Sequence, residues 1–525
     1  MAIVFILTLG LILRLININQ SLWLDETVQA ITSKGSFLGI FTELRGDFHP
    51  PLYHLLMWGW AHLFGNGEIA MRLPSVFFGT ATIWVVYLIA KNLFPKKLSI
   101  IHSPLSIPGI VSLFLVTAPF HIYYSQEART YAMTAFFACL SMYYFIRLVR
   151  SQELGVRSGE KKTQYSTLRT QNLKYILATV LLLYSDYYGL FVFLAQIIAA
   201  AIIFRKKFLS KYLNVYISII LLFLPCLPLL WIQLKTGSQA TAFLPEWGRL
   251  VNLSFLKALP LTFIKFSIGR ITIFDKKIYA LVAGVLFLVY GGIILKAARG
   301  LMLDVRNVKT KDTKRAGEAS GQTSRIILFC WLFVPILLAW GISFFVPNYQ
   351  PFRLLLVLPA FYLLLAYGIS KISVSMIRII GTIFILLVNL VSVGVYYTNP
   401  YFHREDWRGA VKYIESQDGK SSLALIPSET SHWPYEYYSK GKVKLVGVGQ
   451  EIKPVDEKDL EKLANSESLS ILHSPFSIYY LYYLADLFDP QSLIPNWLES
   501  QKFAKIGEVS FNQVLVQEWE KGKNE

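Results

Sequence analysis

The sequence is poor in charge and carries no nucleotide-binding signature. Only 16% of its 525 residues are charged, whereas soluble domains carry about 25%, and 54% are hydrophobic. There is no Walker-type glycine-rich loop and no Gly-x-Ser-x-Gly nucleophile elbow. The composition argues against an ordinary soluble domain, and because these motifs are absent we expect no nucleotide cofactor.

Cysteine is scarce as well. The three cysteines, Cys139, Cys226 and Cys330, all lie in apolar runs, and none has the spacing of a metal ligand. We expect small buried apolar side chains here, with no structural disulfide and no zinc site.

What the sequence has in abundance is long apolar runs. Several approach the roughly 20 residues that cross a hydrocarbon core. The N-terminal run lacks the basic start and the small-residue cleavage site of a signal peptide, so we interpret it as the first span. The pattern predicts a polytopic α-helical membrane protein of about eleven transmembrane helices, at residues 1–16, 69–93, 105–119, 132–148, 173–184, 188–204, 213–231, 278–295, 326–346, 352–370 and 376–396.

Charge predicts the orientation of these spans. The net charge is +18, and Lys and Arg concentrate at 147–174, 205–207 and 296–325. The positive-inside rule puts these loops in the cytoplasm, so we expect no nucleic-acid partner. The opposite side then holds the first outer loop 17–68, together with 120–131, 185–187, 232–277, 347–351 and the chain after about 397. The basic residues in 232–277 conflict with this orientation locally.

The composition changes near residue 399. The transmembrane domain is expected at 1–398, followed by an extracytoplasmic soluble α/β domain at 399–525. Strand-like runs occur at 422–426, 443–448, 469–473 and 509–516, and helix-like stretches occur at 407–416 and 456–464.

The first outer loop contains the most informative residues. Asp25 and Glu26 follow the first span, and carboxylates at a membrane edge mark a site when they face a cavity. The alternatives are a solvated loop or, for Asp25, a helix cap. Asp47 and His49 lie in the same loop, where His49 is a candidate for hydrogen bonding or metal ligation. Residues 50–64 have the spacing of a helix lying in the membrane interface.

A second outer segment adds both signs of charge. Glu127 and Arg129 lie two residues apart beside Tyr131, at the mouth of a span. Arg353 lies at the outer end of another span. An arginine fork suits a phosphate, so Arg129 and Arg353 are candidates for an anionic head group. A surface ion pair and a snorkelling side chain are the alternatives.

Four segments together resemble a known family. They are Leu22-Trp23-Leu24-Asp25-Glu26, His49-Pro50-Pro51-Leu52-Tyr53, Tyr124-Ser125-Gln126-Glu127-Ala128-Arg129-Thr130-Tyr131 and Arg353-Leu354-Leu355-Leu356-Val357-Leu358-Pro359-Ala360. Arg72-Leu73-Pro74-Ser75 and Asp406-Trp407-Arg408 also fit. In order and spacing they resemble the GT-C membrane glycosyltransferases that use polyprenyl-phosphate sugars, in the branch of protein O-mannosyltransferases, aminoarabinose transferases and RgtA/B/C/D-like enzymes.

The resemblance implies roles for these residues. Asp25 would be the catalytic base with Glu26 beside it, and Glu127 would be a second catalytic acidic residue. Arg129, Arg353 and Tyr131 would bind the donor phosphate. A divalent metal, Mg or Mn, would take Asp47, His49 and Glu127 as ligands. The second acidic position is often Asp in related branches, and Glu127 departs from that pattern.

The resemblance also implies an activity. It implies transfer of a hexose or pentose, with inversion, from a polyprenyl-phosphate donor to a lipid, glycan or protein acceptor outside the cytoplasm, by a multi-pass enzyme of the plasma membrane. A transporter or flippase of lipid-linked glycans is the alternative. Such a protein would place ionisable groups near the bilayer midplane, whereas here they lie at span ends on one side.

Overall fold

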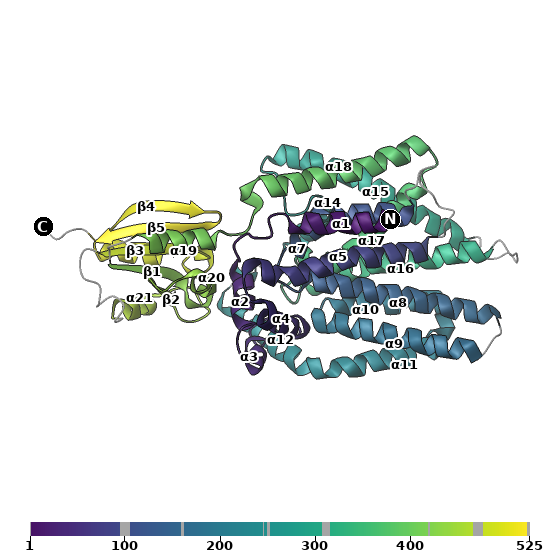
Figure 1. Ribbon diagram of the computed structural model, residues 1–525, viewed down its shortest axis with the longest axis horizontal. Helices are drawn as coiled ribbons and strands as arrows, with labels where there is room; N and C mark the ends of the chain where they lie inside the picture. The colour runs from purple at the N-terminus through teal and green to yellow at the C-terminus, as the bar shows by residue number, and fades with distance from the viewer. Residues whose placement is uncertain are drawn as a thin grey trace.

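A bundle of long helices and a small β-sheet domain make up the molecule (Figure 1). The computed structural model describes residues 2–94, 106–158, 162–244, 246–248, 252–306, 315–417, 421–465 and 476–521. The helices of the bundle run side by side, and the sheet domain lies beyond one end of them. The predicted fold class, a polytopic helical protein with a small C-terminal α/β domain, is confirmed.

The bundle is formed by long, mostly apolar helices. They are α1 (Ala2–Leu15), α5 (Glu68–Leu93), α6 (Ile107–Val116), α7 (Pro119–Ser125), α8 (Tyr131–Ser158), α9 (Lys162–Ser185), α10 (Gly189–Phe204), α11 (Phe208–Phe223), α12 (Leu227–Phe243), α14 (Phe255–Ile268), α15 (Lys276–Arg306), α16 (Arg315–Ile342), α17 (Leu358–Ser370) and α18 (Ser375–Thr398). Short 3₁₀ segments, η1 (Arg205–Lys207), η2 (Leu224–Cys226) and η3 (Pro351–Val357), join some of them.

Each of the eleven predicted spans coincides with at least one of these helices. In the described part of the chain, eight helical segments are long and apolar enough to cross a membrane. The number rises to nine if α6 and α7, bent by 59° at the short break just before Pro119, form one broken span. Helix α1 is apolar but shorter, and α9 is not among the eight.

The predicted outer loop 232–277 is not a loop throughout. It contains the end of α12 and the whole of α14, which is not among the candidate spans. Helix α14 packs against α7, α18 and η3. The basic residues of 232–277 conflicted with the positive-inside rule. Two of them, Lys257 and Lys265, belong to this packed helix rather than to a free loop.

Three short helices gather where the bundle meets the sheet domain: α2 (Leu24–Thr32), α3 (Phe37–Glu43) and α4 (Leu52–Phe64) (Figure 1). The helix predicted at 50–64 is confirmed as α4. The first outer loop is thus a folded, largely helical layer over the end of the bundle.

The C-terminal domain is a five-stranded sheet in the order β2-β1-β3-β5-β4. Strands β1 (Ser421–Ser428), β2 (Lys444–Gly449) and β3 (Phe476–Tyr482) are parallel, while β4 (Phe503–Phe511) and β5 (Val514–Lys521) form an antiparallel hairpin. Its helices are α19 (Trp407–Ser416), α20 (Trp433–Tyr438), α21 (Glu457–Ala464), α23 (Ala485–Phe488) and α24 (Leu493–Ser500), with 3₁₀ turns η4 (Pro400–Phe402) and η5 (Glu429–Ser431).

Most of the elements expected after residue 399 are present. The runs at 422–426 and 443–448 lie in β1 and β2, and the stretches at 407–416 and 456–464 are α19 and α21. The single strand expected at 509–516 is wrong: the chain turns at Asn512 and Gln513, which have positive φ, and separates β4 from β5. The run at 469–473 lies outside the described residues.

The sheet domain docks on the bundle through polar contacts. The Tyr438 hydroxyl donates to Glu68 at 2.6 Å and accepts from the backbone N–H of Leu22 at 2.7 Å. Arg408 pairs with the same Glu68 at 2.7 Å, and Tyr437 donates to the carbonyl of Asn66 at 2.8 Å. These contacts fix the start of α5 and the first outer layer against α19 and α20.

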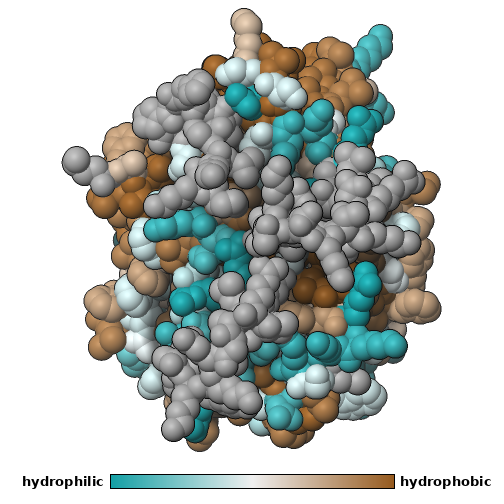
Figure 2. Space-filling model, turned by 90° about the vertical axis from the view of Figure 1, so that its right-hand side faces the viewer, coloured by the Kyte–Doolittle hydropathy of each residue, from teal (hydrophilic) through white to brown (hydrophobic). Residues whose placement is uncertain are grey.

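The opposite end of the bundle has a different character. Figure 2 views that end, and among the atoms not drawn in grey, hydrophilic groups lie towards the middle while hydrophobic groups dominate the rim. The basic cluster Arg205–Lys207 and Lys371 follow helices that run towards this end. An apolar belt around polar ends is the surface expected of a chain surrounded by lipid.

The packing of α15 against α17 depends on one glycine. A Cβ on Gly368 would overlap the carbonyl oxygen of Ile293 on the neighbouring helix. We expect Gly368→Ala to force the two helices apart and lower the unfolding midpoint of the purified protein in a thermal melt, because a packed interface cannot absorb an added atom at this distance.

Gly291→Ala is the matched control for this substitution. Gly291 lies in α15, and a Cβ there would meet no atom within 4 Å. Removing a glycine from a helix interior without a clash should leave stability unchanged or raise it by about 0.5–1 kcal/mol. Equal melting points for the two variants would contradict the close-packing argument.

Candidate functional site

A buried ion pair between Glu26 and Arg72 lies at the centre of the region where the outer loops meet. Arg72 Nε lies 2.8 Å from Glu26 Oε1, Nη2 lies 2.5 Å from Oε2, and both side chains are essentially without exposure. The same guanidinium donates to three backbone carbonyls in the 18–21 segment, and Glu26 accepts from the N–H of Ala128 at 2.8 Å. The pair joins the first outer loop, α5 and the segment before α8.

Electrostatics agree with a structural role for Glu26. Burial alone would raise the pKa of its carboxyl, but the Arg72 guanidinium, together with Arg404 and the N–H of Ala128, holds that pKa below its usual value. The carboxylate is ionised and fully engaged by Arg72 and Ala128. Because no oxygen is left for a substrate, its surroundings favour anchoring over catalysis.

Asp25, the neighbouring carboxylate, has a more open position. It is the second residue of α2, and its side chain is 37% exposed. Its Oδ2 lies 3.5 Å from Nη2 of Arg129. Successive residues of a helix point in different directions, so the Asp25 side chain is partly exposed while that of Glu26 is buried.

Arg129 connects Asp25 to a second group of polar residues. Its Nη2 lies 3.8 Å from Asp47 Oδ1 and 3.4 Å from Nδ1 of His49. Asp47 in turn contacts His49 at 2.8 Å and His54 at 2.9 Å. Burial would raise the pKa of Asp47, but His49 and Arg129 hold it well below its usual value. The predicted residues Asp25, Asp47, His49 and Arg129 are therefore brought together.

The three residues expected to bind a metal are not assembled into one site. Both Asp47 oxygens are already engaged by His49 and His54, with the Arg129 charge close by. Glu127 pairs with Arg404 instead. Within the described ranges, no group of three or more His, Cys, Asp or Glu side chains is arranged to hold a metal ion. The donor set does not fit a metal-dependent step.

Glu127 contributes to a different network, which includes the C-terminal part of the chain. Arg404, in the link between α18 and α19, donates to Glu127 Oε2 at 2.7 Å and to the carbonyl of Tyr123 at 3.2 Å. Its guanidinium also stacks over the Tyr123 ring, 3.9 Å from the ring centre. Burial raises the pKa of Glu127 and Arg404 opposes this without overcoming it.

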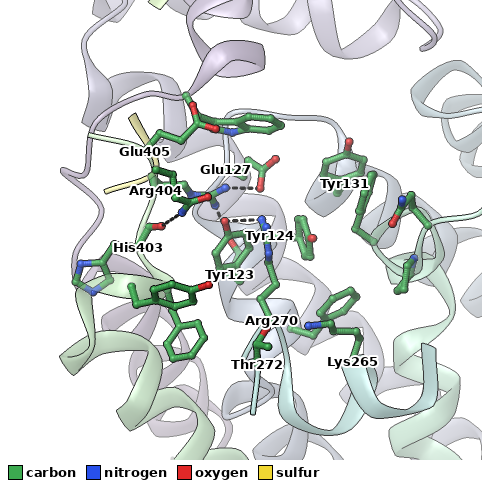
Figure 3. Close-up of a pocket in the computed structure, with 18 of the residues that line it drawn as sticks. Tyr123, Tyr124, Glu127, Tyr131, Lys265, Arg270, Thr272, His403, Arg404 and Glu405 are labelled. Carbon is green, nitrogen blue, oxygen red and sulfur yellow. Dashed lines mark hydrogen bonds and ion pairs between the residues drawn. The ribbon is translucent and has the colours of Figure 1, made fainter. Parts of the chain in front are cut away.

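A cavity of about 470 Å³ opens beside this ion pair (Figure 3). It lies where α7, α14, η3 and the 401–405 link converge. Its walls combine aromatic rings with both signs of charge: Trp23, Phe120, Tyr123, Tyr124, Glu127, Tyr131, Leu261, Lys265, Arg270, Thr272, Gln350, Pro351, Phe352, Tyr401, Phe402, His403, Arg404, Glu405 and Gln513.

Two cations in this cavity were missed from the sequence. Lys265 lies on α14, and no described residue accepts a hydrogen bond from its ammonium; burial, followed by the Arg270 charge, lowers its pKa to about 8. Arg270 donates to the Tyr123 hydroxyl at 2.7 Å and forms no ion pair with a described carboxylate. Both were hidden in a segment that the sequence assigned to a loop.

The predicted phosphate ligands have different positions. Tyr131 lines the cavity, whereas Arg129 and Arg353 are not among its lining residues. Arg353 lies about 6 Å from the ring centres of Tyr188 and Phe352, and its buried Nε has no partner in the described structure. The charges of both arginines still act on Tyr131, so neither arginine is far from this wall of the cavity.

Glu405 is a further residue that sequence reasoning missed, although its neighbours Asp406, Trp407 and Arg408 carried part of the resemblance. It lies at the edge of the cavity, across from Lys265 (Figure 3). Burial raises the pKa of its carboxyl to about 7. The charge of Asp25 adds to this effect, so the two carboxylates face the same region.

Known proteins share this architecture. Residues 48–157 match the family model described as dolichyl-phosphate-mannose-protein mannosyltransferase. The crystal structure of ArnT from Cupriavidus metallidurans bound to undecaprenyl phosphate aligns with a TM-score of 0.55 at 13% identity, covering 98% of this chain and 97% of that chain. No curated protein matches this chain by sequence.

Two structures of an archaeal enzyme also align. The Archaeoglobus fulgidus oligosaccharyltransferase in complex with Zn and sulfate gives a TM-score of 0.53 at 12% identity, over 98% of this chain and 73% of that chain. AglB from Archaeoglobus fulgidus, with an inhibitory peptide and a dolichol-phosphate, gives 0.51 at 11%, over 98% and 74%. The resemblance to the GT-C membrane glycosyltransferases is therefore confirmed at the level of the fold.

The anchoring role of Glu26 predicts a large loss of stability on its neutralisation. Glu26→Gln leaves the Arg72 charge buried without a counter-ion, so we expect the free energy of unfolding to fall by about 3–5 kcal/mol. Unfolding of the purified protein by SDS in mixed micelles measures this change. Because the pKa of Glu26 is lowered in the fold, wild-type stability should also fall as the pH drops below the ordinary glutamate range.

Glu508→Gln is the control. Glu508 pairs with Lys505 on the surface of β4, where both side chains are about 40% exposed. Loss of such a pair should change the unfolding free energy by at most about 1 kcal/mol. A similar small effect for Glu26→Gln would show that the buried pair does not anchor the loops.

Proposed function

Because this chain has the fold of the GT-C membrane glycosyltransferases, we propose that it transfers a hexose or pentose from a polyprenyl-phosphate donor to an acceptor. The observation that carries the proposal is the cavity at the sheet-domain end of the bundle. Two cations without carboxylate partners, Lys265 and Arg270, lie there among aromatic walls. Asp25 is not among the lining residues, but its charge acts on Glu405 at the edge of the cavity. The proposed orientation places this end outside the cytoplasm, in a multi-pass protein of the plasma membrane.

The charges of the cavity suit a phosphate. Of its two carboxylates, Glu127 is neutralised by Arg404, and burial disfavours the ionised form of Glu405. Lys265 and Arg270 then provide a net positive charge. As the sugar leaves, negative charge builds on the phosphate oxygens, and cations fixed in a partly buried cavity stabilise that charge strongly. Arg129 and Arg353, whose charges act on Tyr131, add positive potential near the cavity.

The cavity also offers a route for a lipid tail. Tyr401 lines it and is 55% exposed, and its ring packs edge-on against Phe274, which is 69% exposed. Such large exposed rings at the end of a membrane bundle suit the interface region. We place the polyprenyl chain along these rings, with its phosphate at Lys265.

Asp25 is the residue we propose as general base. A carboxylate within reach of an acceptor hydroxyl can take its proton as the oxygen attacks the anomeric carbon. The Asp25 side chain is partly exposed, and Arg129 at 3.5 Å helps to orient it. Direct displacement assisted by a base inverts the anomeric configuration, as in inverting glycosidases. Glu127, fixed by Arg404, would position the donor side of the cavity rather than move a proton.

Asp25→Asn tests the proposed base. Membranes containing wild type or variant are incubated with a panel of labelled polyprenyl-phosphate sugars, and transfer of label is followed. We expect the variant to lose at least roughly 100-fold in rate, the usual contribution of a positioned general base. The affinity for a short-chain polyprenyl phosphate should change little.

Asp275→Asn is the matched control. Asp275 accepts two backbone hydrogen bonds at the start of α15, and asparagine caps helices as well as aspartate does. Transfer by this variant should equal that of wild type. Equal transfer by Asp25→Asn would refute the base. A labelled glycolipid that crosses the bilayer without being consumed would instead indicate a flippase.

The pH dependence of donor binding tests the phosphate site. Lys265 has a pKa of about 8, so its ammonium loses its proton as the pH rises above that value. The second ionisation of a phosphate monoester has a pKa of about 6. It is therefore nearly complete at pH 8, and the charge of the ligand stays constant above that pH. We expect the affinity of the purified protein for a short-chain polyprenyl phosphate to fall above pH 8. Lys265→Arg, which stays charged, should abolish that fall.

Lys257→Arg provides the comparison on the same helix. Lys257 is exposed on α14 and does not line the cavity, so its substitution should leave the wild-type pH profile intact. If Lys265→Arg also retains the wild-type profile, the phosphate does not bind at Lys265.

A further inference from the structure

A second cavity, of about 630 Å³, lies between the sheet domain and the bundle. Its walls include Tyr482 and Tyr483 at the end of β3, Asp486 on α23, and Glu246 from the segment after α12. Both parts of the chain therefore build it. On one side, Leu244 and Trp247 pack against Leu484, Leu487 and Phe488, which fixes the two walls relative to each other.

The two cavities share part of their lining. Glu405 and Gln513 border both of them. In Figure 3, Glu405 lies at the edge of the first cavity, away from Lys265 and Arg270. A molecule in the second cavity would therefore reach the proposed donor site past Glu405.

Glu405 is held so that one of its oxygens is available. Trp407 Nε1 donates to Oε2 at 2.8 Å, and the Tyr483 hydroxyl donates to the same oxygen at 3.0 Å. Oε1 accepts no hydrogen bond from any residue that the structure describes. The side chain is thus oriented by two bonds while its second oxygen remains open to a ligand.

The lining of the second cavity indicates the class of ligand. The carboxyl groups of Glu405 and Asp486 lie among tyrosine rings, and none of the described lining residues is Lys or Arg. The exposed carboxylate of Asp486, with no described Lys or Arg in the lining, disfavours phosphates and carboxylates. Carboxylates accept strong hydrogen bonds from hydroxyl groups, and tyrosine rings present flat apolar faces with a polar edge. Together these groups suit a sugar.

We propose that the second cavity is the acceptor site and that it takes a neutral, hydroxyl-rich glycan. Oε1 of Glu405 accepts a hydrogen bond from the sugar hydroxyl that enters the first cavity, and so aims that oxygen at the donor. This assignment rests on the proposed glycosyl transfer for its biological meaning. Glycan binding itself can be measured without any transfer.

Binding of neutral sugars to the full-length protein in nanodiscs tests the proposal. A panel of neutral disaccharides is titrated and followed by saturation-transfer NMR, with a short-chain polyprenyl phosphate present to occupy the first cavity. We expect at least one disaccharide to bind wild type. Glu405→Gln and Asp486→Lys should each weaken that binding roughly 10-fold, equal to about 1.4 kcal/mol.

The control variants distinguish an effect of the cavity charge from an effect of surface charge elsewhere on the protein. Asp486 is exposed, so its substitution should leave the fold intact, and Glu499→Lys makes a similar charge change on exposed α24 outside the cavity. Glu499→Lys should bind as wild type does. Disaccharides that carry a uronic acid should bind wild type more weakly than neutral ones.

Two outcomes would overturn the assignment: unchanged binding in both cavity variants, or uronic-acid sugars binding as tightly as neutral ones. Absence of binding by every neutral disaccharide would also overturn it. Failure of the proposed transfer looks different, because labelled donor would then stay unconsumed while neutral sugars still bind in a Glu405-dependent way.

Discussion

The buried ion pair between Glu26 and Arg72 is the interaction on which the arrangement of the outer layer depends. One guanidinium on α5 engages a carboxylate of α2 and three carbonyls of the 18–21 segment, and the same carboxylate holds Ala128. Burying two charges is costly unless almost every polar atom is satisfied, and this pair meets that condition. Because the segments on either side of it carry Asp25 and Arg129, one structural contact positions two proposed functional residues.

Around this ion pair, neighbouring carboxylates differ in burial and in hydrogen-bond partners, and these differences suit them to different roles. Glu26 is ionised and fully paired, Glu127 is paired through a single guanidinium, and Asp25 keeps more than a third of its surface open. Glu405 is oriented by two donors on one oxygen. Differences in burial and hydrogen bonding separate anchoring from chemistry among groups of the same type.

Much of the helical scaffold was predictable, because apolar runs long enough to cross a bilayer have few alternatives to helix. Helical spacing located α4 and α19, and strand-like runs located β1 and β2. The strand-like runs did not include β3, and they did not separate β4 from β5, because the turn at Asn512 and Gln513 lies inside a single strand-like run. The cluster of Asp25, Asp47, His49 and Arg129 was foreseen as residues on one face, and the structure brings them into contact.

What the sequence could not show is which distant charges pair. Nothing local marks Lys265, Arg270 or Arg404 as cavity residues, since their role arises only where α7, α14 and the 401–405 link converge. Glu127 was expected beside Asp47, yet Arg404, 277 residues away along the chain, takes it instead. Ion pairs between residues so far apart in the chain depend on tertiary packing, which cannot be inferred from the local pattern of a single sequence.

The link that carries Arg404 and Glu405 has a consequence for how the protein is made. Ribosomes extend a chain from its N-terminus, so every helix of the bundle is synthesised before this link emerges. The cavity lacks one wall, and Glu127 lacks its partner, until the last quarter of the chain has been made and the sheet domain has docked. The order of synthesis therefore keeps an immature chain from presenting the complete form of the proposed donor site to the lipids around it.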